Sequence, residues 1–143
     1  MDLHYTLTDN QFVEDFEQGR LNPSWFNHEA HLRLAYIYIR NLGPRKAAEK
    51  ICEDILQFDR VFGSDDKFHK TITIASIGVL SHFMGKATTA DFRSLINEFP
   101  QLKFEFKRLL LSHYSSRLLS DISSKTHYYQ PDILPDLVFE EIG

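Results

Sequence analysis

The chain has 143 residues, a formal net charge of -4 and 43% hydrophobic residues. This length fits a single domain, residues 1–143, with a substantial core. No block of lysine and arginine stands out, so neither nucleic acid nor a membrane is expected as a partner. The longest apolar run, at 34–39, is far shorter than the ~18 residues of a transmembrane helix. A single cysteine and the absence of a signal-peptide pattern predict a cytoplasmic protein.

Hydrophobic periodicity predicts helices from the start of the chain. Residues up to Leu7 are weakly patterned and are expected to form an extended arm. Thr8 and Gln11 have the spacing of a capping box, and a short amphipathic helix should follow them. Asn27 is a good N-cap for a helix over residues 28–40, which is apolar on more than one side. We therefore expect that helix at the centre of the fold.

The helical pattern continues toward the C-terminus. A loop at 63–66 offers N-cap candidates for the helix that follows it. The tail at 128–137 should be an extended, proline-containing segment anchored on the helices by Ile133, Leu134 and Leu137. The further predicted helices cover 44–58, 67–83, 91–96 and 100–114, and the last of these either continues through 115–119 or restarts there after a kink. The sequence predicts an all-α fold, a compact bundle of about six helices.

Three histidines form the first candidate site. His28 and His31 are one helical turn apart and share a face, and His69 lies near the start of another predicted helix. Three neutral imidazoles suit zinc, iron, copper or nickel at an open site, with water or substrate in the remaining position. In this interpretation the three histidines are metal ligands and the cofactor is a divalent transition metal.

A site without metal is the second interpretation. His28 or His69 would act as a general base near neutral pH. Thr73 and Ser76 follow His69 at helical spacing, so Thr73 could position a substrate and Ser76 could bind a ligand. Arg117 could anchor an anion from the C-terminal helices.

Two metalloenzyme motifs are excluded by spacing. The stretch from His28 to His31 lacks the i, i+4 histidine pair of the His-Glu-x-x-His protease motif, and Glu29 points away from His28. The apolar stripes carry no inward glutamate of the di-iron bundle type. Glu29 is therefore interpreted as a partner of the helix dipole. The other histidines are expected to be structural or exposed: His4, His82, His113 and His127.

Two segments, 26–35 and 68–73, resemble the paired motifs of a family of small uncharacterised bacterial proteins. That family pairs F-x-H-x-x-H-[LV]-x-x-A with [YF]-H-x-T-x-T and ends in a segment like 131–135. Phe68 and Lys70 stand where the family usually has tyrosine and glutamate. The resemblance implies no established activity. It implies that the motif positions here are His28, His31, His69, Thr71 and Thr73, with Thr71 as a further ligand-binding candidate.

These patterns predict a small-molecule or metal site in a histidine-lined pocket between helices, formed by His28, His31 and His69. Metal-assisted or general-base catalysis could use that site, and the sequence leaves open whether the protein is an enzyme. The alternative is a non-catalytic interaction module or homodimer, in which the histidines form a buried structural network.

Overall fold

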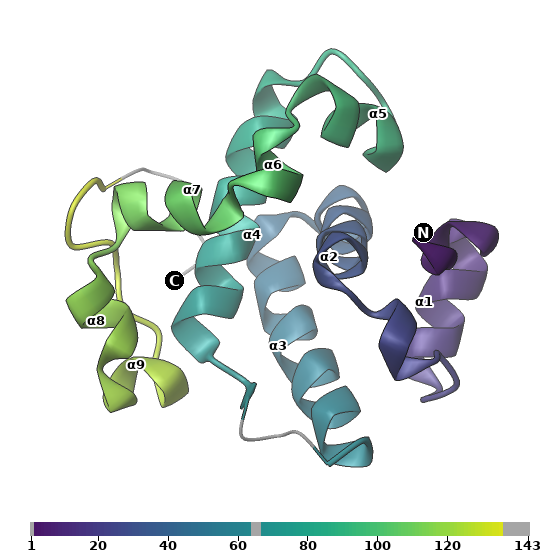
Figure 1. Cartoon of the computed structure of the whole chain (residues 1–143), viewed down its shortest axis with the longest axis horizontal. Coiled ribbons are helices and arrows are strands. Elements are labelled where there is room, and N and C mark those ends of the chain that lie inside the picture. Colours follow the sequence, from purple (N-terminus) through teal and green to yellow (C-terminus); the bar gives the residue numbers. More distant parts are fainter. Residues whose placement is uncertain (1, 64–66, 136–143) are drawn as a thin grey trace.

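The computed structural model describes residues 2–63 and 67–135, and within them every regular element is a helix (Figure 1). Two short 3-10 helices, η1 (Leu3–Thr6) and η2 (Pro23–Trp25), precede the central part of the fold. The α-helices are α1 (Asp9–Glu17), α2 (His28–Leu42), α3 (Pro44–Val61), α4 (Lys70–Lys86), α5 (Phe92–Glu98), α6 (Gln101–Phe104), α7 (Phe106–His113), α8 (Ser116–Ser120) and α9 (Ile122–Thr126). The prediction of an all-α fold is confirmed. Across the described ranges, none of the helices is both long and apolar enough to cross a membrane.

Local capping fixes where several helices begin. The Thr8 hydroxyl accepts the Gln11 N–H at 3.2 Å and the Gln11 side chain accepts the Thr8 N–H at 3.0 Å, which forms the predicted capping box. Asn27 Oδ1 accepts the Ala30 N–H at 2.9 Å and starts α2. Gly43, with φ of 82°, separates α2 from α3 in a conformation that glycine adopts readily.

The structure differs from the sequence predictions at three helix boundaries. The expected N-terminal arm is the helix η1, and its His4 is fully buried. Helix α4 begins at Lys70 because His69 Nδ1 accepts the Ile72 N–H at 3.1 Å and caps it; the expected cap at 64–66 lies outside the described residues. The helix predicted over 100–114 is divided into α6 and α7 by Glu105, whose φ of -133° is not helical.

Helices α2, α3 and α4 form the centre of the molecule, and α2 is buried on several sides (Figure 1). Leu34 is fully buried there, and two charged residues of this helix, Glu29 and Arg33, are buried as well. Arg33 donates to His4 O at 2.6 Å and Leu7 O at 2.9 Å, and it pairs with Asp9 at 2.8 Å. This arginine holds the N-terminal segment against α2.

The C-terminal segment is held by polar contacts. The Thr71 hydroxyl donates to His127 O at 2.7 Å, and the Tyr114 hydroxyl donates to Tyr129 O at 2.9 Å. Ile133 and Leu134 are 55% and 52% exposed, so the prediction that their side chains anchor this segment is wrong. The third predicted anchor, Leu137, lies outside the described residues.

Candidate functional site

A cavity of about 430 Å³ lies between α2, α3, α4 and α7. Its walls are mainly apolar and include Leu32, Ile55, Ile77 and Leu110. Four polar side chains also line it, and all four were singled out from the sequence: His28, His31, Thr73 and Ser76. The first turn of α2 supplies the histidines, and one face of α4 supplies the hydroxyls.

The His31 ring is fixed by two contacts. It stacks on Phe26 with ring centroids 3.7 Å apart, and its Nδ1 lies 2.8 Å from Asn27 O. A carbonyl oxygen only accepts, so Nδ1 carries the proton and Nε2 keeps a lone pair. Burial lowers the pKa of His31, a charge on His28 lowers it further, and the bond to Asn27 offsets this only in part. The neutral ring is therefore favoured near pH ~7.

The His28 ring is held at the opening of α2 by contacts with α6 and α7. Its Nε2 lies 3.0 Å from Leu102 O and so donates a proton to it. The ring meets Phe106 edge-on at a centroid distance of 5.2 Å. Nδ1 is left without a protein partner among the described residues. Each of the two histidines thus donates a hydrogen bond to a backbone carbonyl from one ring nitrogen, and its other ring nitrogen has a lone pair.

The two hydroxyls on α4 bond to their own helix. Thr73 Oγ1 donates to His69 O at 2.7 Å, and Ser76 Oγ donates to Ile72 O at 2.7 Å. Such bonds to a carbonyl one turn earlier are common for threonine and serine in helices. Both residues line the cavity, and their oxygens keep lone pairs that can accept a hydrogen bond.

His69 does not join this group. Its Nδ1 caps α4, and its Nε2 donates to Leu119 O at 2.9 Å with Ser124 Oγ at 3.2 Å. Both ring nitrogens are thereby occupied, and the ring does not line the cavity. Through these bonds His69 joins α4 to α8 and α9. The structure does not assemble the metal site predicted from His28, His31 and His69, and it leaves His69 no free nitrogen for general-base chemistry.

Two further candidates also lie away from the cavity. Thr71 is fully buried and bonds to His127 O and to the Tyr129 N–H, so it secures the C-terminal segment. Arg117 is exposed on α8 and does not contact the cavity. Burial raises the pKa of the Cys52 thiol to about 11, which makes it a poor nucleophile.

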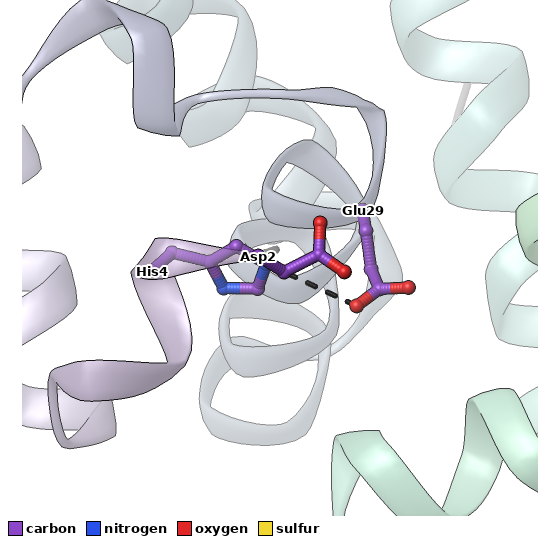
Figure 2. A group of neighbouring side chains, drawn as sticks. All are labelled: Asp2, His4 and Glu29. Atoms are coloured by element: carbon purple, nitrogen blue, oxygen red, sulfur yellow. Dashed lines mark ion pairs between the residues drawn. The ribbon is translucent and has the colours of Figure 1, made fainter.

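A second polar cluster, formed by Asp2, His4 and Glu29, lies where η1 meets the start of α2 (Figure 2). One potential ligand atom from each residue lies within 4.8 Å of the others, so the group could hold a metal ion. The Nε2 atom of His4 lies 4.0 Å from a Glu29 oxygen and forms no hydrogen bond, although the side chain is fully buried. The cluster therefore combines the spacing of metal ligands with a buried ring nitrogen that has no hydrogen-bond partner among the described residues.

Neighbouring cations already balance the charge of that cluster. Lys103 Nζ lies 3.0 Å from Glu29 and 3.5 Å from Asp2. The guanidinium of Arg33 lies 3.3 Å from His4 Nδ1, which must accept because arginine only donates. The proton of the neutral ring is therefore on Nε2, the ring nitrogen that lies 4.0 Å from Glu29. Burial, and then the charge of Arg33, lower the pKa of His4.

Sequence reasoning missed this cluster, since His4 was expected to be structural or exposed and Glu29 only a dipole partner. Arg33 is the signal that could have revealed it, because one charge inside an apolar helix requires buried polar partners.

Comparisons with protein-family models, with curated proteins and with solved structures found no match to this chain. The resemblance to a bacterial helical family thus stays a prediction, and the function must be argued from the geometry.

Proposed function

We propose that this protein binds a small, largely apolar molecule in the cavity between α2, α3, α4 and α7. The observation that carries the proposal is a pair of imidazole nitrogens, on His28 and His31, that have no protein partner among the described residues and belong to side chains lining an apolar space of about 430 Å³. Ligand pockets typically have volumes of ~300–1,000 Å³, apolar walls and a few convergent polar groups. This cavity has all three properties.

The fixed histidine rings support binding over a purely structural role. His69, which joins α4 to α8 and α9, bonds both of its ring nitrogens within the protein. His28 and His31 both line the cavity, and each uses one backbone contact to set the ring orientation. The other ring nitrogen of each has no protein partner among the described residues. A ligand held there would complete the hydrogen bonding of both rings.

The same arrangement could support general-base chemistry. His31 is the better base candidate because its tautomer and ring plane are fixed by Asn27 and Phe26. Its Nε2 could accept a proton from a bound substrate in the neutral state. Binding does not require this proton transfer, which would follow only with a ligand that carries an acidic proton.

The test is a titration of ¹⁵N-labelled protein with a library of small aromatic and aliphatic compounds, followed by NMR. We expect hits that shift the amide signals of cavity residues such as Ala35, Thr73 and Ile77. Substitution His31→Ala should weaken those hits. His82→Ala serves as the control, because His82 lies exposed on α4 and does not line the cavity. A library that yields no cavity hits, or hits equally tight in His31→Ala, would overturn the proposal.

A further inference from the structure

We infer that the ligand of this cavity carries a hydrogen-bond donor, most suitably a primary amine, at its polar end. The inference rests on the proposed function and deepens it by naming the chemical class that the site selects. It follows from the donor and acceptor state of the four polar side chains that line the cavity: His28, His31, Thr73 and Ser76.

All four groups offer lone pairs. The Nε2 proton of His28 and the Nδ1 proton of His31 are engaged by Leu102 O and Asn27 O, so the lone pairs of His28 Nδ1 and His31 Nε2 remain as acceptors. The hydroxyl protons of Thr73 and Ser76 are engaged by helix carbonyls at 2.7 Å, so their oxygens can also only accept. The backbone contacts have therefore made the polar part of the cavity a set of acceptors.

These acceptors favour ligands that donate hydrogen bonds over ligands that only accept them. A carboxylate or a phosphate would bring more lone pairs to a site whose polar side chains offer lone pairs already. Among residues 2–63 and 67–135, no lysine or arginine lines the cavity. An alcohol can supply one donor. An ammonium group has three donors and can meet several of these acceptors together.

The aromatic wall favours the same class. Phe106 lines the cavity beside His28, and aromatic rings attract cations through their negative faces. The remaining wall is aliphatic and matches an apolar body attached to the amine. The predicted ligand is thus an amphiphilic amine, with its nitrogen at the histidines and its apolar part among the isoleucines of α3 and α4.

Three probes of one shape test this inference: phenylbutylamine, phenylbutanol and phenylbutanoate, each measured by calorimetry at about pH 8, where neutral imidazole dominates. We expect the amine to bind at least about tenfold more tightly than the carboxylate, the value of one well-formed hydrogen bond, with the alcohol between them. Equal binding of amine and carboxylate, or tighter binding of the carboxylate, would overturn the inference and leave the proposed function standing. Failure of all three probes to bind would overturn both.

A substitution at His28 can replace a hydrogen-bond acceptor of the cavity with a donor. Because His28 is exposed at the start of α2, His28→Lys should be tolerated and would place a donor beside the cavity. It should weaken the amine and strengthen the carboxylate. His82→Lys adds the same side chain on an exposed part of α4 that does not line the cavity and should leave the order of the probes unchanged. If His28→Lys also leaves that order unchanged, the histidines do not recognise the polar end and the inference fails.

Discussion

Substitution of Ala35 by leucine should stabilise the protein and weaken ligand binding. Ala35 is 4% exposed and lines the cavity, so a larger side chain there fills space between α2, α3 and α4. Three added carbons at ~0.8 kcal/mol for each buried methylene give up to ~2.4 kcal/mol. The rotamer entropy of a buried leucine removes ~0.5–1 kcal/mol. The free energy of unfolding should therefore rise by about 1.5 kcal/mol.

Urea unfolding measures that change, and calorimetry with a cavity ligand measures the loss of affinity. The matched control is Ala48→Leu: Ala48 is 1% exposed on α3 and does not line the cavity. Overpacking should lower the stability of this control by ~1–3 kcal/mol. A gain in the free energy of unfolding for Ala35→Leu and a loss for Ala48→Leu would show that Ala35 borders a cavity. If Ala35→Leu lowers the free energy of unfolding as much as the control does, no cavity borders Ala35 and the reasoning is refuted.

The remaining predictions concern the contacts around the cavity. Arg33→Met should lower the free energy of unfolding by about 3 kcal/mol, because it leaves buried carbonyls without a donor. Asp9→Asn changes a side chain that is 47% exposed and should lower the free energy of unfolding by less than ~1 kcal/mol. Equal urea midpoints for the two variants would contradict this difference. Thr71→Val should loosen the C-terminal segment and speed proteolysis near His127, and an unchanged cleavage rate would show that the hydroxyl does not hold that segment. His4 and His31 have pKa values below the reference 6.5, so the unfolded chain binds more protons in this range and stability falls as the pH drops below 6.5. The slope for each histidine has an upper limit of about 1.4 kcal/mol per pH unit, and a flat urea midpoint between about pH 7 and 5 would contradict the prediction.

Much of the helical fold could be predicted because its signals are local. The capping box at Thr8 and the N-cap at Asn27 depend on residues three positions apart, and both appear in the structure. The C-terminal segment could not be placed in this way. It is held by the side chains of Thr71 and Tyr114, which are far from it in the sequence, whereas hydrophobicity pointed to residues such as Ile133.

The site could be predicted in part, for a related reason. His28, His31, Thr73 and Ser76 lie at helical spacing on two helices, and the structure brings them to one cavity. His69 was placed on the same stripe as Thr73 by assuming that the helix began before it. As the N-cap it has an extended backbone, with φ of -130° and ψ of 109°, so its side chain leaves the helical face.

The second cluster depends on contacts that no periodicity reveals. Its members His4 and Glu29 are brought together where Arg33 holds the N-terminal segment against α2, and Lys103 contacts Glu29 from α6. Only the isolated charge of Arg33 gave a local hint of buried polar partners.

The most direct test of the account is ¹⁵N NMR of the imidazole nitrogens, with and without the bound amine. The account predicts that His31 is protonated at Nδ1 and bare at Nε2, that His28 has the opposite tautomer, and that a saturating amine shifts the two bare nitrogens. Rapidly exchanging tautomers in both rings, or an amine that binds without shifting either nitrogen, would contradict it.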